Sequence, residues 1–259
     1  MQASIGSHCL ECAKAARPDL RTRARFWSAR QAAMVTMVLI ALNVLVFVYT
    51  TVRDPASLAG NLTIGHAELG LHRGALGDGL VVPFSDGTIY RTDGGDWYRL
   101  ITSGFLHFGI VHIGFNMYLL YVLGQMLEPN LGRVKFLLVY LAGLLGGAAG
   151  SLLIDGNALA GGASGAVFGL MGLAFVGYYL HGANPLTTSI GTLLMLNLFI
   201  TFAFPRISIG GHLGGAAAGA ICALVVMAPR WKGVPAWAGY VAPVAVSALC
   251  VVVAATAVG

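Results

Sequence analysis

The chain has 259 residues, of which 57% are hydrophobic and only 10% are charged, and its formal net charge is +5. Soluble domains carry roughly 25% charged residues, so this composition excludes a single soluble core and indicates a polytopic membrane protein. The positive charge lies mostly in the amino-terminal tail and the loops, and we expect no nucleic-acid partner.

The chain begins with a polar, basic tail, residues 1–30, which we expect to be cytoplasmic. We expect no cleavable signal peptide, because the apolar run that follows is long enough to span a bilayer. Cys9 and Cys12 form a Cys-x2-Cys pair in this tail. One such pair is half of a tetrahedral zinc site, so no metal site is predicted.

Apolar segments follow the tail, and each is near the ~20 residues that a helix needs to cross the hydrocarbon core. These segments are residues 31–52, 105–127, 134–154, 163–182, 187–204, 210–228 and 236–257. The fold class predicted is therefore an all-α membrane protein, a polytopic bundle of about seven transmembrane helices. We divide it into a core, residues 31–230, and an additional carboxy-terminal transmembrane helix within residues 231–259.

The connection between the first two spans, residues 53–104, is the longest. It carries Gly, Asp and Pro together with alternating apolar residues. Such a segment has turn signals and a strand-like pattern, so we expect it to have local structure of its own.

The basic residues predict the orientation in the membrane. With a cytoplasmic amino terminus, the inner segments hold ten Lys and Arg residues and the outer segments hold five. Because short cytoplasmic loops are enriched in Lys and Arg, this placement is favoured, and it puts the carboxyl terminus outside. We expect the plasma membrane as the location.

Reactive polar side chains lie near the outer ends of three spans in this orientation. His112 and Asn116 are one turn apart near the start of the second span, Ser164 opens the fourth, and His212 opens the sixth. Ionisable groups within hydrocarbon are costly and indicate a functional site by default. A serine with a histidine is the minimum for activating a hydroxyl nucleophile, so the pattern indicates a serine hydrolase built inside a membrane.

Each of these residues also has a structural interpretation. Serine is enriched where membrane helices touch, and a lone histidine there more often forms an interhelical hydrogen bond. His112 and Asn116 point the same way as an i, i+4 pair and could bond each other. For Asn43 and Asn197, isolated in their spans, holding helices together is the preferred interpretation.

Glycines predict how the serine and the histidine meet. His212, Gly215 and Gly219 share one helical face, and a small-x3-small face lets another helix approach closely. The fourth span offers a matching face, which consists of Gly165, Gly169 and Gly172. We therefore expect the fourth span to pack on the sixth and to bring Ser164 to His212.

Other residues support this site. Gly162 and its neighbours leave backbone N–H groups free at a helix start, where the dipole favours a developing anion. Phe168 lies one turn after Ser164 and would support the imidazole by packing. No acidic residue lies in the fourth or sixth span, so a Ser-His dyad is predicted. Glu128 is assigned a structural role, with hydrogen bonds to the adjoining loop.

With these motifs in this order, the chain resembles the rhomboid intramembrane serine proteases. The resemblance covers roughly residues 31–230. It rests on Trp97-Tyr98-Arg99-Leu100, His107, His112-x3-Asn116, Glu128, Gly162-Ala163-Ser164-Gly165 and His212-x2-Gly215-x3-Gly219. The additional span resembles the six-plus-one arrangement of part of the family, and the Cys-x2-Cys element resembles the end of a module on some bacterial rhomboids.

The resemblance implies a Ser164 nucleophile and a His212 base. It further implies that His112 and Asn116 assist the oxyanion, and that His107 helps to organise the site. Such an enzyme hydrolyses peptide bonds in or near the transmembrane segments of membrane-protein substrates within the lipid bilayer. It needs no cofactor or metal, and its active site opens to the outer side.

The sequence departs from the family pattern at two of these positions. Trp97 stands one place earlier than expected relative to Arg99, and Phe168 stands where many members carry tyrosine.

Two rival functions remain open. One rival is a catalytically idle rhomboid-like protein that binds membrane clients, although such relatives usually lack the serine or the histidine. A small-solute transporter is weaker, because Glu128 is its sole candidate for an intramembrane charge.

Overall fold

The computed structural model describes residues 33–205, 207–228 and 233–259. The basic tail with its Cys-x2-Cys pair lies outside the described residues, as do Arg206 and residues 229–232.

Within the described residues, five helices are long and apolar enough to cross a bilayer. They are α3 (Met34–Arg53), α7 (Ile110–Leu131), α8 (Arg133–Ile154), α11 (Ile209–Val226) and α12 (Ala238–Val258). The two other expected spans form shorter apolar helices, α9 (Ser164–Leu180) and α10 (Ser189–Ala203). With 17 and 15 residues, these two rise only about 25 and 22 Å. Helix α9 is thus at the lower end of the length range of a membrane span, and α10 is shorter than that range.

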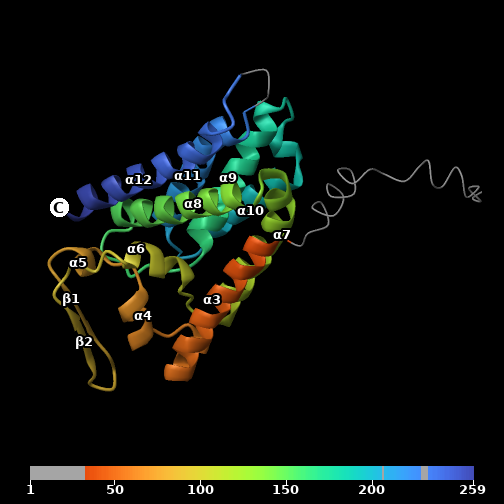
Figure 1. Ribbon diagram of the computed structural model, residues 1–259. Helices are drawn as coiled ribbons and strands as arrows, with labels where there is room; N and C mark the ends of the chain where they lie inside the picture. Colours follow the sequence, from red (N-terminus) through yellow and green to blue (C-terminus); the bar gives the residue numbers. More distant parts are fainter. Residues whose placement is uncertain (1–32, 206, 229–232) are drawn as a thin grey trace, which may run out of the picture. The chain divides into compact units, whose positions relative to one another are not determined.

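Helices α8, α9 and α11 pack against one another, and α12 packs on α8 and α11 (Figure 1). The main core is apolar and lies among α7, α8, α9 and α11. Its fully buried side chains include Leu120, Phe136, Tyr140, Leu170 and Leu173. This arrangement is a helical membrane bundle, as the composition predicted.

The backbones of three core helices approach closely at glycine. A Cβ added to Gly147 of α8 would lie 2.8 Å from the Cα of Gly165 in α9 and 3.0 Å from the carbonyl oxygen of Gly211 in α11. Since the neighbouring atoms belong to backbone, no side chain can rotate away to make room. Glycine at this position therefore sets how closely α8, α9 and α11 approach.

The connection between α3 and α7 has local structure, as predicted. It contains a short antiparallel hairpin, in which Leu80 pairs with Thr92 and Pro83 pairs with Ile89. Its elements are η1 (Pro55–Ala59), α4 (Ile64–Leu69), α5 (Arg73–Leu76), β1 (Leu80–Pro83), β2 (Ile89–Thr92), α6 (Arg99–Thr102) and η2 (Ser103–Phe105).

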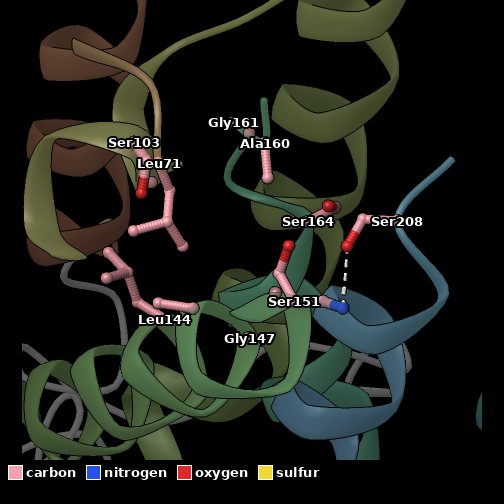
Figure 2. A pocket seen from close by; sticks show the side chains of 14 residues that line it. Leu71, Ser103, Leu144, Gly147, Ser151, Ala160, Gly161, Ser164 and Ser208 are labelled. Atoms are coloured by element: carbon pink, nitrogen blue, oxygen red, sulfur yellow. Dashed lines mark hydrogen bonds between the residues drawn. The ribbon is translucent and has the colours of Figure 1, made fainter. Parts of the chain in front are cut away.

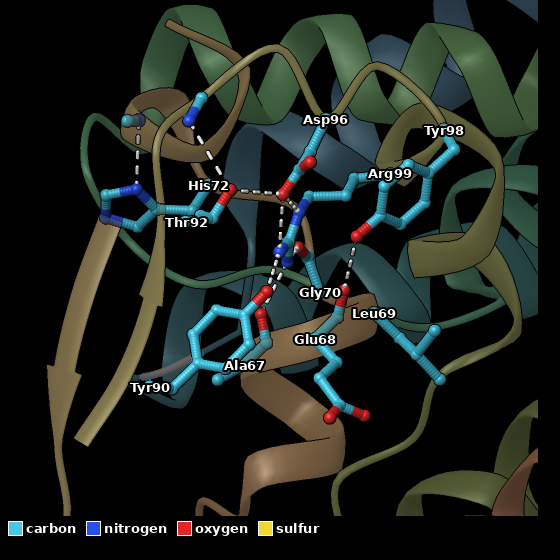
Figure 3. A network of polar contacts seen from close by, with 12 residues as sticks. Ala67, Glu68, Leu69, Gly70, His72, Tyr90, Thr92, Asp96, Tyr98 and Arg99 are labelled. Carbon is cyan, nitrogen blue, oxygen red and sulfur yellow. Dashed lines mark hydrogen bonds and ion pairs between the residues drawn. The ribbon is translucent and has the colours of Figure 1, made fainter. Parts of the chain in front are cut away.

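Arg99 organises this connection from a fully buried position. Its guanidinium donates hydrogen bonds to the carbonyl oxygens of Ala67 and Gly70, to the Tyr90 hydroxyl and to the Asp96 carboxylate (Figure 3). A buried charge is tolerated only when it is paired and hydrogen-bonded. The network therefore ties α4, β2 and α6 into one unit beside the helices.

Glu128 has a structural role, but its partners differ from those expected. The carboxylate, near the end of α7, accepts hydrogen bonds from the N–H of Val35 at 2.9 Å and of Thr36 at 2.8 Å, and from the Thr36 hydroxyl at 2.7 Å. These amides begin α3 and have no partner within their own helix. Glu128 thus caps α3, where a carboxylate also complements the helix dipole, instead of bonding the adjoining loop.

The amide side chains in two spans bond within their own helices. The Asn43 N–H donates to the Leu39 carbonyl at 2.7 Å, and the Asn197 N–H donates to the Leu193 carbonyl at 2.7 Å. One N–H of each amide is thus used within its own helix, because an amide beside the carbonyl one turn earlier finds an acceptor locally. A primary amide has a second hydrogen and an oxygen, so the expected role of each in holding helices together stays a prediction.

Candidate active site

Ser164 is the first residue of α9. Gly162 precedes it at a φ of 137°, a backbone conformation open to glycine and strained for other residues, and this lets the chain turn sharply into the helix. A Cβ on Gly162 would lie 2.9 Å from His112 Nε2 and 3.7 Å from the Ser164 hydroxyl oxygen. The start of α9 therefore lies directly against the His112 ring.

His212 lies in the first turn of α11, and only 8% of its surface is exposed. The Ser208 hydroxyl caps this helix by accepting from the Gly211 N–H at 2.8 Å, and it donates to the Asp155 carboxylate. The same carboxylate accepts from the Gly210 N–H at 3.0 Å. Two side chains thus satisfy the first amides of the helix and fix the position from which His212 projects.

The predicted contact between the serine and histidine helices is confirmed. A Cβ on Gly215 would lie 2.1 Å from the carbonyl oxygen of Gly165, and one on Gly219 would lie 1.8 Å from that of Gly169. A Cβ on Gly172 would lie 2.3 Å from a carbonyl oxygen of α11. The glycine faces that the sequence predicts for the two spans are therefore in contact backbone to backbone, as close helix packing in membranes requires.

The predicted packing of Phe168 on the imidazole is also confirmed. The Phe168 and His212 rings are stacked, with centroids 4.1 Å apart and an angle of 16° between planes. Phe168 is buried and lies one turn after Ser164 on α9. The structure records no hydrogen bond between the Ser164 hydroxyl and His212 among the described residues. Such bonds are often long in ligand-free sites and tighten when substrate binds.

Thr201 of α10 is a partner of His212 that the sequence did not reveal. Its hydroxyl oxygen lies 2.6 Å from His212 Nδ1, and it donates a hydrogen bond to the backbone carbonyl of Asn197 at 2.7 Å. A threonine in an apolar span is usually a helix contact, so no local signal distinguished it. The partner of the histidine is a neutral hydroxyl, in keeping with the absence of acidic residues from the fourth and sixth spans.

Two histidines stand beside the start of α9. The His107 ring contacts the His112 ring edge to face, with centroids 5.0 Å apart. His107 Nε2 accepts from the Ala163 N–H at 3.4 Å, and His112 Nδ1 accepts from the Phe108 N–H at 3.2 Å. A neutral imidazole that accepts at one nitrogen carries its proton on the other, so His112 Nε2 is a donor next to Gly162.

Asn116 lies one turn further along α7 and is buried. One of its amide hydrogens is used by the His112 carbonyl, at 3.0 Å. A primary amide has two hydrogens, so Asn116 keeps a second donor for another group.

A small cavity of about 40 Å³ lies beside Ser164. Four hydroxyl side chains line it, from Ser103, Ser151, Ser164 and Ser208, together with Leu71 and backbone of several glycines (Figure 2). One water molecule needs about 10–15 Å³ of such volume, so the cavity has room for a few waters next to the serine.

Comparison with known proteins identifies the family. Residues 94–229, more than half of the chain, match the rhomboid domain. This chain belongs to the rhomboid family. The matched region of this rhomboid carries Ser164, His212 and the other polar residues of the site and ends before α12, while α3, β1 and the cavity-lining Leu71 precede it. Together with its long apolar helices, this membership makes the chain a multi-pass membrane protein.

Several relatives support the assignment. Rhomboid protease GluP of Bacillus subtilis is 36% identical over 140 residues, which are 52% of this chain and 27% of that protein. Rhomboid-type serine protease 2 of Emericella nidulans is 34% identical over 157 residues, 58% of this chain and 31% of the relative. RHOMBOID-like protein 5 of Arabidopsis thaliana is 34% identical over 141 residues, 51% and 45% respectively. The rhomboid thus spans less than half the length of each of these relatives.

Proposed function

We propose that this rhomboid is an intramembrane serine protease, which hydrolyses peptide bonds in or near the transmembrane segments of membrane-protein substrates. The observation that carries the proposal is the backbone contact between α9 and α11 at Gly165 and Gly215, with Phe168 stacked on His212. The helix that begins with Ser164 and the helix that holds His212 therefore touch one residue after the serine and three residues after the histidine, which supports a dyad of these two side chains. The names of two relatives, which call them proteases, agree with this chemistry.

Ser164 and His212 divide the covalent chemistry between them. The Ser164 oxygen attacks the substrate carbonyl carbon, while His212 Nε2 takes the hydroxyl proton as general base. The attack forms the bond from the Ser164 oxygen to the carbonyl carbon and leaves a negative charge on the carbonyl oxygen. His212 then gives its proton to the leaving amine as the peptide bond breaks, which leaves the acyl-enzyme. A water molecule, deprotonated by the same imidazole, hydrolyses the acyl-enzyme and restores the Ser164 hydroxyl.

Three donors in this proposal stabilise the oxyanion. His112 offers Nε2–H, because its Nδ1 already accepts from a backbone N–H, and Asn116 offers its second amide hydrogen. The Ser164 N–H lies at a helix start, where the dipole favours negative charge. Donors fixed in place before the reaction lower the barrier most effectively.

Supporting residues hold these groups in position. Gly162 provides the turn into α9, and His107 links the segment before α7 to the Ala163 N–H beside the serine. Gly215 and Gly219 set the distance between the two catalytic helices. No step of this chemistry requires a metal or an organic cofactor.

The organisation of the chain in the membrane belongs to the same proposal. We assign residues 31–230 to the protease core, residues 231–259 to an additional transmembrane helix and residues 1–30 to a cytoplasmic tail. The bias of Lys and Arg toward the inner segments supports a cytoplasmic amino terminus, and we place the protein in the plasma membrane. The starts of α7, α9 and α11, and with them the active site, then open to the outer side.

Labelling with a fluorophosphonate probe tests the proposal. The purified protein should form one covalent adduct, located on Ser164 by mass spectrometry, whereas Ser164→Ala and His212→Ala should form none. A folded wild-type protein that resists the probe yet retains membrane proteins on affinity capture would be the catalytically idle, client-binding rhomboid instead.

A further inference from the structure

We infer that Thr201 is a positioning residue for His212: its hydroxyl holds the proton of the imidazole on Nδ1 and leaves Nε2 free to act as the base. The inference rests on the proposed function, because it assigns the state of the base in that reaction.

The geometry places Thr201 at the edge of the ring. The hydroxyl oxygen lies 2.6 Å from Nδ1 of His212, and both side chains are buried, with 1% and 8% of their surface exposed. Phe168 covers a face of the same ring. Phe168 of α9 therefore holds one face of the imidazole, and Thr201 of α10 holds the edge with Nδ1. Neither residue bonds the edge with Nε2.

The single hydrogen of the threonine hydroxyl decides which group donates in the bond between Thr201 and His212. A threonine hydroxyl has a single hydrogen, and the Asn197 carbonyl, which can only accept, lies 2.7 Å from the Thr201 oxygen. With its hydrogen on that carbonyl, the hydroxyl turns its lone pairs toward Nδ1 and accepts from Nδ1–H. The neutral imidazole then has an unprotonated Nε2.

The same arrangement serves the ring after it has taken the serine proton. The doubly protonated imidazole is a donor at both nitrogens, so its Nδ1 partner must still be an acceptor. A hydroxyl committed to the Asn197 carbonyl meets this need in both states without moving its hydrogen. It also orients the ring without placing a second ionised group in the membrane, where charge is costly.

Thr201→Val and Thr201→Ser test the inference. Valine keeps the shape and removes the acceptor, so we expect kcat to fall about ten- to a hundredfold, as for a buried group left without its partner, while KM stays within about twofold. Serine keeps the hydroxyl, and its kcat should stay within about threefold of wild type. The matched control is Thr192→Val on the same helix, whose exposed hydroxyl donates to the carbonyl of Thr188, the N-cap residue of α10, and which should leave kcat unchanged.

A second readout does not depend on turnover. The nitrogen chemical shifts of isotope-labelled histidine, with the His212 signals assigned by comparison with His212→Gln, should report protonated Nδ1 and bare Nε2 in the wild type. Thr201→Val should move this pair of signals toward the opposite tautomer. A cooperative thermal unfolding transition in Thr201→Val would show that this variant folds, which separates loss of positioning from loss of fold.

The outcomes distinguish this inference from the proposed function. Wild-type turnover in Thr201→Val, equal losses in the Ser and Val variants, or His212 signals with bare Nδ1 in the wild type would overturn the role of Thr201 alone. A wild-type protein that neither cleaves nor reacts with the fluorophosphonate probe would overturn the protease assignment, while the nitrogen signals would still decide whether Thr201 holds the proton on Nδ1.

Discussion

At the scale of single residues, the site depends on which nitrogen of each histidine carries the proton. His112 accepts a backbone N–H at Nδ1, so its Nε2 is a donor. His212 faces the Thr201 hydroxyl at Nδ1, so its Nε2 is an acceptor. The same residue type is thus prepared for opposite roles within one site, and the hydrogen bond at the far side of each ring makes the difference.

Asn116→Ala should lower turnover and leave substrate affinity nearly unchanged, because its free N–H acts mainly on the transition state. Loss of one oxyanion donor typically costs about 2.7–4 kcal/mol. The matched control is Asn130→Ala, since Asn130 is exposed on the same helix and its amide bonds the carbonyl one turn earlier. Steady-state kinetics of both variants decide the role. An unchanged kcat with a raised KM in Asn116→Ala would remove it from oxyanion binding.

Asp96 gives the connection between α3 and α7 a pH dependence. Burial alone would raise the pKa of Asp96, but hydrogen bonds from Thr92 and Arg99 and the charge of Arg99 outweigh it and lower the pKa. A carboxyl group with a lowered native pKa stabilises the fold above its ordinary pKa of about 3.9, and this stabilisation disappears as the pH falls through the native value. Asp96→Asn should therefore lower the unfolding temperature at neutral pH.

Thermal unfolding measured from pH 7 down to about pH 3 checks this linkage. The difference between wild type and Asp96→Asn should stay nearly constant down to about pH 4 and shrink only below that, as the pH falls toward the lowered pKa of Asp96. Asp93→Asn, in the same segment and exposed, is the control and should follow the wild type throughout. A difference that stays constant with pH would show that the carboxylate charge of Asp96 does not stabilise the segment.

At the scale of elements, glycine positions the site. The backbone of α11 lies against that of α9 at Gly215, whose added Cβ would be 2.1 Å from the carbonyl oxygen of Gly165. Gly165 directly follows Ser164, so the separation of the two helices also sets the position of the serine. Packing and catalysis are therefore coupled through this contact.

Gly215→Ala should push α9 and α11 apart. Overpacking of a close contact costs roughly 1–3 kcal/mol, and a displacement of about 1 Å can cost on the order of a hundredfold in rate. We expect slower fluorophosphonate labelling and a lower unfolding temperature. The control is Gly114→Ala on α7, where an added Cβ meets nothing within 4 Å. If both variants react and unfold like the wild type, the glycine contact does not position the serine.

Helical periodicity explains which features of the site the sequence could predict. Residues spaced by three and four share a face whatever the fold around them, so the face of Gly215 and the stacking of Phe168 followed from spacing. Thr201 could not be found this way, because its contact depends on how α10 lies beside α11. The cap that Glu128 forms on α3 could not be predicted for the same reason, since Glu128 and Thr36 are 92 positions apart.

The ends of two helices also could not be predicted from the sequence. Hydropathy predicted spans through residues 163–182 and 187–204, whereas α9 and α10 cover Ser164–Leu180 and Ser189–Ala203. Apolar composition continues past a helix end into a turn, and hydropathy alone does not detect the hydrogen bonds that end the helix. The turn between them contains Pro185 in a short 3-10 helix, which the sequence marked only as a turn.

At the scale of the whole molecule, the rhomboid match at residues 94–229 covers the site and leaves α3 and α12 outside it. Helix α12 packs on α8 and α11, and the Lys135 ammonium at the start of α8 lies 4.8 Å from the centre of the Tyr240 ring. Such a cation–π contact is worth about 0.5–1 kcal/mol at an exposed site. The additional helix is thus attached to the core by apolar packing and a contact near its first turn.

The proposed orientation predicts which ends of the chain face outward. In a variant without the four native cysteines, a cysteine at Gly259 should react with an impermeant thiol reagent in intact cells. A cysteine at Asn130, exposed near the end of α7, should react only after lysis. The opposite pattern would place the active site on the cytoplasmic side.

Cleavage of a transmembrane substrate in reconstituted lipid vesicles tests the central claim most directly. The purified wild-type protein should convert a single-span substrate into two fragments, and mass spectrometry should place the new termini in or near the transmembrane segment. Ser164→Ala, folded and inserted in the same vesicles, should leave the substrate intact. Cleavage by Ser164→Ala at the wild-type rate, or an intact substrate with folded wild-type protein, would contradict the account.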